Sequence, residues 1–218
     1  RHINTFRAYG EAGVYRSQGP SRAAALGAIG VIVRTLSPVI DDHPHTGATR
    51  YDENQPKIPA VAISTSGAEE LSKAIAAKMV KQLYLKTNCK QLEDVLSYNV
   101  VGELKGSEFP DEIITVGGHL DSWDLAEGAH DDGTGCVQSI EVLRSLKAIG
   151  GRPKRTVRAV MFMNEENGLR GGTKYAEIAK EENKKFIMAL ESDAGGFTPR
   201  GFGYTANATQ KELLFKWK

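Results

Sequence analysis

From Tyr98 onward the sequence alternates between short segments rich in β-branched residues and longer segments with helical spacing. The segments that we expect as strands span residues 99–104, 112–117, 156–163 and 186–190. The expected helices lie between them, at about 133–149 and 170–182. Because strands that alternate with helices usually pair in parallel, this order predicts an α/β fold with helices packed on a mixed, largely parallel sheet.

The chain before this alternation is expected to form a smaller α/β unit. It combines helical segments at 21–28 and 66–79 with strand segments at 30–35, 60–64 and 80–85. Residues 38–59 hold prolines and aspartates without an apolar period, so we expect one long loop there. The polar residues 87–96 are expected to connect the two parts.

The two ends of the sequence point to a piece of a longer protein. Thr209 and Glu212 have the spacing of a capping box, which predicts a helix that begins there. The sequence stops at Lys218, which leaves that helix too short to be stable alone. The start at Arg1 resembles neither a signal peptide nor an initiator methionine. We therefore expect these 218 residues to be a fragment.

Composition excludes several classes of partner. The 28 basic and 27 acidic residues are interspersed and leave a net charge of +1, so we expect no nucleic-acid partner. No apolar stretch reaches the roughly 18 residues that a membrane span needs, so we expect no membrane partner. The two cysteines cannot form a disulfide framework or a multi-cysteine zinc site, and Cys136 is expected to pack as a small apolar residue. They leave the redox compartment undetermined.

Polar residues with metal-ligating side chains stand where the predicted strands end. Four of them follow strands, and one precedes a helix: His119, Glu165, Glu166, Asp193 and Asp131. In open sheets of this kind, sites form beyond the carboxyl ends of the strands, so these side chains are expected at one edge. Imidazole and carboxylates together are the ligands of a hydrolytic metal site.

The spacing suggests separate roles within that site. His119 can bind a metal through one ring nitrogen, and the carboxylate of Asp121 is of the kind that orients such an imidazole. Asp131 can bridge two ions with its two oxygens. Glu165 and Glu166 are adjacent and must project in different directions, so one can bind metal while the other takes a proton from water. Asp132 is expected to cap the following helix through backbone amides.

The segments GGHLDSWD, GAHDDGTG, NEENG and ESDAGG resemble the motifs of the co-catalytic dizinc exopeptidases, the zinc aminopeptidase superfamily. Within that group the sequence is most similar to the carboxypeptidase Q type. Further matches are YRSQGPSRAAALGA, PHTG, KIPAVAIS and GGRPKRTVR, so the resemblance spans almost the whole chain. It is more specific than any single motif.

The resemblance implies a phosphorylase/hydrolase-like three-layer sandwich at 98–218, incomplete at its C-terminal end, preceded by a protease-associated-type domain at 1–97. It implies that His119, Asp131 and Asp193 hold one zinc, and that Asp131 bridges to a second zinc held by Glu166. It also implies that Glu165 is the general base that takes a proton from the attacking water. The peptide bond after Asp131 is expected to be cis, as is common in the family.

One departure concerns the second zinc. In the family this ion has a terminal histidine ligand well downstream of the ESDAG segment, and the sequence ends before that position. None of the other histidines stands at the matching place: His2, His43, His45 and His130. The first zinc site is therefore expected to be complete in these residues and the second to lack one ligand. His43 and His45 are expected in a structured loop rather than in a metal site.

We therefore expect a zinc-dependent exopeptidase that hydrolyses short peptides or dipeptides. Aminopeptidase, carboxypeptidase and dipeptidase activities stay open, as does a homodimer. The resemblance implies a secreted or periplasmic protein. Two other functions are kept as alternatives: a non-catalytic binding or receptor-like fragment, and a single-zinc glutaminyl cyclase. The matching ligands argue against the first, and an assay of glutamine cyclisation would decide the second.

Overall fold

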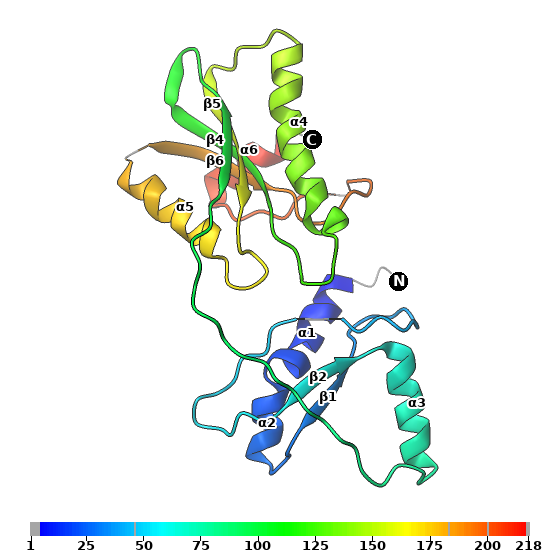
Figure 1. Cartoon of the computed structure of the whole chain (residues 1–218). Helices are drawn as coiled ribbons and strands as arrows, with labels where there is room; N and C mark the ends of the chain where they lie inside the picture. Colours follow the sequence, from blue (N-terminus) through cyan, green and yellow to red (C-terminus); the bar gives the residue numbers. More distant parts are fainter. Residues whose placement is uncertain (1–4, 46, 183, 200, 217–218) are drawn as a thin grey trace. The chain divides into compact units, whose positions relative to one another are not determined.

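The computed structural model describes residues 5–45, 47–182, 184–199 and 201–216. The chain divides into two compact units, which are labelled by element in Figure 1 and are described separately here. The first unit runs to Ser97 and includes Trp123–Ala126, and the second comprises Tyr98–Ser122 and the residues from Glu127 onward.

The first unit is a small α/β arrangement. Its two strands, β1 (Val31–Arg34) and β2 (Ala60–Ile63), pair in parallel. Its helices are α1 (Thr5–Ser17), α2 (Gly19–Ala25) and α3 (Thr65–Ala76). Helix α3 begins where expected, because the Ser64 hydroxyl accepts a hydrogen bond of 3.0 Å from the Gly67 amide and so caps its first turn.

The structure differs from expectation at two places in this unit. Helix α1 was not expected from the sequence, because its two glycines, Gly10 and Gly13, weaken its helical propensity. The strand expected at 80–85 is absent from the described residues, and the segment has no regular structure. Leu83 and Tyr84 are exposed there, and a strand forms only where a neighbouring backbone supplies hydrogen bonds.

The long loop between β1 and β2 is structured, as expected. The buried Thr65 hydroxyl donates to the Val39 carbonyl at 2.9 Å and accepts from the Asp41 amide at 2.8 Å. The amide of His45 donates to the Thr35 hydroxyl at 2.9 Å. These bonds fix the loop backbone and leave the side chains of His43 and His45 exposed.

The second unit is built on a mixed sheet in the order β3-β5-β4-β6. Its strands are β3 (Val100–Leu104), β4 (Phe109–His119), β5 (Arg155–Phe162) and β6 (Lys185–Glu191). Strand β4 runs parallel to β5 and β6, and only β3 is antiparallel to its neighbour. The sheet is therefore mixed and largely parallel, as the alternating pattern predicted.

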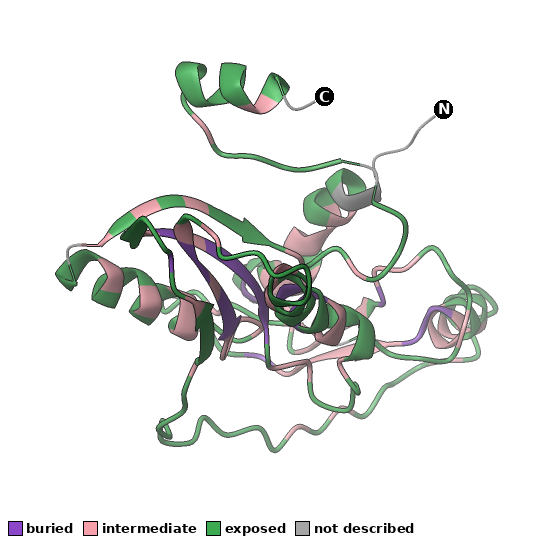
Figure 2. Cartoon of the chain, turned by 90° about the horizontal axis from the view of Figure 1, so that it is seen from above, coloured by how far each residue is buried: buried purple, intermediate pink, exposed green. Residues whose placement is uncertain are grey.

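One helix covers each face of this sheet, which gives three layers (Figure 1). On one face, Cys136 of α4 (Thr134–Ala148) packs in a buried cluster with Val116 and Met161, as expected for that cysteine. On the other face, Tyr175 of α5 (Arg170–Glu181) makes edge contacts with the rings of Phe162 and Phe186. Figure 2 shows that the buried residues of this unit concentrate in the strands between the two helices.

A last helix, α6 (Ala208–Phe215), lies near the predicted position but has a different cap. The Asn207 side chain accepts from the Gln210 amide, and the Gln210 side chain accepts from the Asn207 amide, both at 2.9 Å. The capping box is therefore two residues earlier than the pair of Thr209 and Glu212 that we expected. Asparagine at the N-cap position can accept a hydrogen bond from a first-turn amide that has no partner within the helix, as threonine can.

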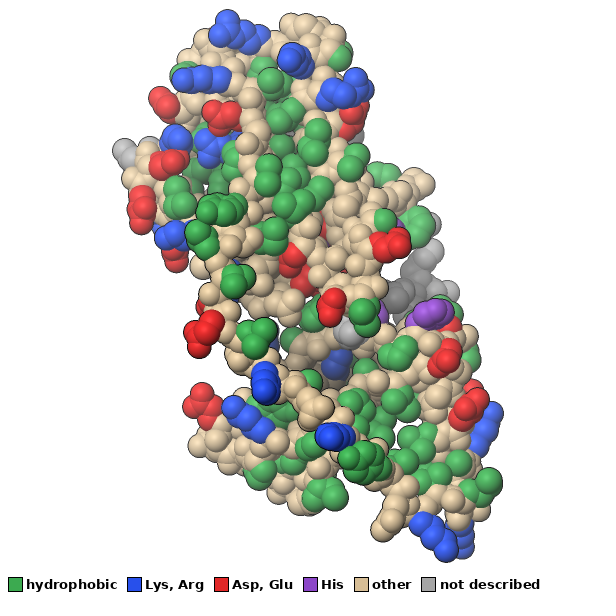
Figure 3. Space-filling model, viewed as in Figure 1, with side chains coloured by type: hydrophobic (Ala, Val, Ile, Leu, Met, Phe, Trp, Pro, Cys, Tyr) green, Lys and Arg blue, Asp and Glu red, His purple; other side chains and the backbone are tan. Residues whose placement is uncertain are grey.

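The surface in view carries no dominant charge. Figure 3 shows Lys and Arg side chains interspersed with Asp and Glu on this face, with hydrophobic side chains gathered between them on the second unit. Among the described residues, no helix combines the length and the apolar character that crossing a bilayer requires.

Candidate metal centre

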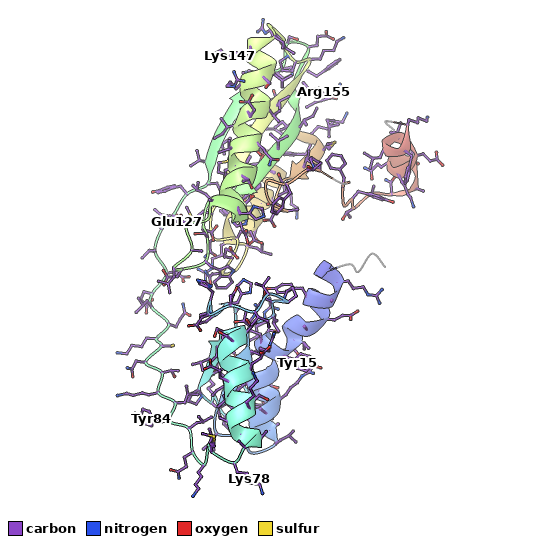
Figure 4. The ribbon with its side chains drawn as sticks, turned by 90° about the vertical axis from the view of Figure 1, so that its right-hand side faces the viewer. Tyr15, Lys78, Tyr84, Glu127, Lys147 and Arg155 are labelled. Carbon is purple, nitrogen blue, oxygen red and sulfur yellow. The ribbon has the colours of Figure 1, made fainter. Side chains whose placement is uncertain are left out.

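The residues expected to form the site meet at one edge of the mixed sheet. Strands β4, β5 and β6 are parallel, and their registers place His119 opposite Phe162, and Gly117 opposite Glu191. The residues that follow β5 and β6 therefore lie beside the end of β4. Figure 4 shows Glu127, shortly before Asp131, at the opposite end of the second unit from Lys147 and Arg155.

His119 is the centre of the group. Its side chain is 1% exposed, and its Nε2 atom lies 3.0 Å from Asp131 Oδ1 and 3.2 Å from Asp193 Oδ1. The two carboxylates come from different loops and remain about half exposed, at 61% and 47%. One buried nitrogen thus faces two accessible carboxylates, which is the donor set expected for the first zinc.

The turn that carries Asp131 leads directly into α4. The peptide bond between Asp131 and Asp132 is cis, as the resemblance implied. Asp132 is buried and caps the helix as expected, because its Oδ1 accepts from the Gly135 amide at 3.0 Å. Its Oδ2 accepts from the His119 amide at 2.9 Å. Both oxygens are held by amides, so Asp132 joins the turn to the end of β4.

Gly135 allows this close approach between α4 and the strand ends. A Cβ atom there would overlap the Ser192 carbonyl oxygen and the Asp132 carboxylate. The same holds for Gly118, where a Cβ would overlap Asp132 and the start of α4. Only glycine lets the backbone of the helix come this near to the two loops that carry Asp131 and Asp193.

Asp121 acts differently from the expectation. The His119 ring is oriented by the backbone carbonyl of Asp121, which lies 2.9 Å from Nδ1, whereas the Asp121 carboxylate is 3.9 Å from that atom. The carboxylate instead accepts the amides of Glu165 at 2.9 Å and Glu166 at 3.2 Å. Spacing alone cannot distinguish a carbonyl from a carboxylate of the same residue, which is why the sequence suggested the wrong group.

Glu166 has the property expected of a metal ligand. Its Oε1 atom is buried and has no hydrogen-bond partner within the part of the chain that the structure describes. A ligand atom of Glu166 lies within 4.8 Å of those of His119 and Asp131. A buried carboxylate oxygen without a partner is costly unless a cation or proton satisfies it. The residues present therefore fit a divalent metal ion.

Asp132 also falls within 4.8 Å of His119 and Asp193 as a potential ligand. Its two oxygens are already engaged by the amides described above, so we do not count it among the ligands. Of the other histidines, His130 contacts Phe197 in a tilted arrangement with ring centroids 4.8 Å apart. His43 and His45 belong to the loop of the first unit, and His2 lies outside the described residues.

The carboxylates change the proton affinities in the site. Burial alone lowers the pKa of His119, but the Asp121 carbonyl and the charges of Asp193 and Asp132 outweigh it and raise the value from 6.5 to about 9. Burial, together with the charge of Asp131, raises the pKa of Glu166 from 4.5 to about 7. Burial is also the main reason that the pKa of Glu165 is raised.

Without metal, the folded protein is expected to lose stability as the pH rises from about 4.5 to 9. Both raised pKa values mean that the folded state binds more protons than the unfolded state in this range. The contribution of charged His119 is full below pH 6.5 and is lost toward pH 9, and that of neutral Glu166 is lost between 4.5 and 7. Thermal unfolding in a chelator from pH 5 to 8 should show this decline.

Zinc should reverse the trend, because it binds the deprotonated ligands. The difference in Tm between zinc-saturated and chelator-treated protein should therefore widen as the pH rises from 5 to 8. A His119→Ala variant should show a much smaller widening, whereas His43→Ala, which removes an exposed histidine of the first unit, should behave as the unmodified protein. If the difference in Tm of the unmodified protein stayed constant or narrowed as the pH rose, His119 and Glu166 would not be the groups that lose protons when zinc binds.

Comparison with known proteins places these features in a family. The pattern of peptidase family M28 matches residues 99–217. The chain is 38% identical over 206 residues to carboxypeptidase Q of Xenopus laevis and 37% identical over 200 residues to that of Homo sapiens. These matches cover 94% and 92% of the chain but 44% and 42% of the relatives. The chain thus spans less than half the length of the curated relatives it matches.

Two solved structures are also similar. The peptidase M28 precursor from Shewanella amazonensis has a TM-score of 0.77 and 34% identity, and the match covers 89% of this chain and 44% of that one. BSAP, a zinc aminopeptidase from Bacillus subtilis, has a TM-score of 0.54 and 27% identity, with 80% and 40% covered. With a family pattern over more than half of its residues, this chain belongs to peptidase family M28.

Proposed function

We propose that the protein is a zinc-dependent exopeptidase that hydrolyses short peptides or dipeptides. The observation that carries this proposal is the buried Nε2 of His119 between the carboxylates of Asp131 and Asp193, at 3.0 and 3.2 Å. Membership of family M28 supports it, as do the names of the similar proteins, carboxypeptidase Q and a zinc aminopeptidase.

The ligands are proposed to divide between two ions. His119, Asp131 and Asp193 would hold the first zinc, and Asp131 would bridge to a second held by Glu166. The unpaired Oε1 of Glu166 and its position near Asp131 support the second assignment. Bound zinc would supply positive charge that polarises the scissile carbonyl and makes a nearby water easier to deprotonate.

Glu165 is proposed as the general base. It takes a proton from the attacking water while the water oxygen bonds to the carbonyl carbon of the substrate, and it passes that proton to the leaving amine as the C–N bond breaks. Its raised pKa favours a group that accepts and then returns a proton. Glu165 also lines a cavity of about 230 Å³ between the sheet and α5.

The remaining assignments rest on the family resemblance. We propose that residues 1–97 form a protease-associated-type domain and residues 98–218 the peptidase domain, and that the protein is exported. Formation of a homodimer stays an open part of this proposal. The expected substrate is a short peptide with at least one free end.

A substrate panel tests the proposal. The whole protein, loaded with zinc, should cleave dipeptides or aminoacyl chromogenic substrates and should lose this activity in a chelator and regain it with zinc. Longer peptides blocked at both ends should not be cleaved, because an exopeptidase requires a free terminus.

Three outcomes would contradict the proposal. Cleavage of doubly blocked peptides alone would exclude an exopeptidase. Cyclisation of an amino-terminal glutamine without peptide hydrolysis would indicate a glutaminyl cyclase. Absence of turnover with zinc bound would leave a non-catalytic binding protein of this fold.

A further inference from the structure

The loop that joins β5 to α5 carries both Glu165 and Glu166, and we take it together with the first two residues of α5 as the loop Met163–Gly171. Two of its residues, Asn164 and Leu169, have positive φ angles of 62° and 58°. Asparagine adopts this conformation readily, whereas it is unfavourable for leucine. Apart from one bond where its two ends meet, its internal backbone hydrogen bonds are long: the amides of Gly168 and Leu169 lie 3.3 and 3.2 Å from the Glu165 carbonyl. The loop therefore depends on groups outside it to keep its shape.

Asn99 holds the loop at its neck, where the two ends of the loop meet. Its Oδ1 accepts the Met163 amide at 2.9 Å, and its Nδ2 donates to the Gly171 carbonyl at 2.8 Å. A third bond of 2.9 Å joins the Gly171 amide to the Met163 carbonyl. A Cβ at Gly171 would overlap Asn99 Oδ1, so glycine is needed for this approach. The amide side chain of asparagine offers a donor and an acceptor side by side in one plane, which matches these two backbone partners.

Asp121 holds the loop at its tip. Its two carboxylate oxygens accept the consecutive amides of Glu165 and Glu166, at 2.9 and 3.2 Å, and the side chain is 17% exposed. Bonds from amides to a carboxylate are stronger than those between neutral groups. The backbone carbonyl of Asp121 lies closer to the His119 ring than its carboxylate does, at 2.9 against 3.9 Å, so the short contacts of the carboxylate are those with the loop.

We propose that Asn99 and Asp121 are positioning residues that together fix the loop Met163–Gly171, and through it the side chains of Glu165 and Glu166. The catalytic consequence rests on the proposed function. The positioning itself is independent of the proposed function, because the bonds join residues of this chain in the absence of substrate. Asn99 had no signal in the sequence, since its two partners are backbone groups far along the chain.

Two variants test this proposal in the whole protein: Asn99→Ala, which removes both neck bonds, and Asp121→Asn, which replaces one acceptor oxygen by a donor. In the metal-free protein, each should raise amide hydrogen exchange by about tenfold or more within 163–171 and little elsewhere. In the zinc-loaded protein, each should lower kcat by about 10–100-fold with KM changed less than about threefold. The more tightly bound zinc should be retained in both.

Asn54→Ala and Asp111→Asn are matched controls, because both side chains are exposed and lie outside the site. The proposal is overturned if exchange in 163–171 is unchanged in both variants. It is also overturned if Asp121→Asn alone releases the tighter zinc, since that would mean the carboxylate orients His119. Absence of peptidase activity in the unmodified protein would refute the proposed function, whereas the exchange result would still decide the positioning role.

Discussion

Replacing Glu165 with glutamine is expected to lower turnover by about 10²–10⁴-fold while zinc stays bound. Glutamine keeps the shape of the side chain but cannot accept the proton of water, so only the base is removed. The backbone amide of Glu165 would still bind Asp121 at the tip of the loop. The variant therefore separates proton transfer from the architecture of the loop and from metal binding.

Steady-state kinetics and elemental zinc analysis on the whole protein measure this effect. The matched control is Glu108→Gln, because Glu108 is exposed and pairs with Lys154 away from the site. The control should keep normal kcat and zinc content. Near-normal turnover in Glu165→Gln would exclude this residue as the base, and loss of zinc would indicate that it is a ligand instead.

Replacing His119 with alanine is expected to abolish measurable turnover and to weaken the binding of the first zinc by at least about 100-fold. The substitution removes the nitrogen that lies 3.0 Å from Asp131 and 3.2 Å from Asp193, so both carboxylates lose this neighbour. It also empties a position where the side chain is 1% exposed, so the folded state should lose stability as well.

A second variant keeps the loss of zinc distinct from a failure to fold. His119→Gln retains most of the volume and should fold while still binding zinc poorly. Competition with a chromogenic chelator measures the zinc affinity, and circular dichroism reports folding. His43→Ala is the matched control and should change neither. Normal zinc affinity in a folded His119→Gln protein would contradict the proposed first site.

The alternation of strands and helices in the second unit could be predicted because its elements have strong local signals. Strand β5 ends in a run of four apolar residues, 159–162, since it lies between two neighbours and under a helix on each face. Helix α4 repeats apolar residues at helical spacing and stops at two glycines, Gly150 and Gly151. The elements of the first unit were harder to predict from the sequence, because α1 contains glycines and the expected strand at 80–85 has no pairing partner among the described strands.

The order of the parallel strands also explains why the members of the site could be predicted without a structure. When β4, β5 and β6 run in the same direction, whatever follows each strand lies at the same edge. His119, Glu166 and Asp193 are brought together by this rule. Their roles as ligands, and that of Glu165 as base, are the predictions that the variants above test.

The sequence by itself determined the fold class, the edge at which the site lies and the types of side chain that gather there, because these depend on local periodicity and on strand direction. Only the tertiary structure decided which atoms of those residues meet. It assigned the carbonyl of Asp121 to His119 and its carboxylate to the loop, and it brought Asn99 to the neck of that loop. Hydrogen bonds between groups far apart in the chain depend on packing to within about an ångström, and no local pattern in the sequence encodes that distance.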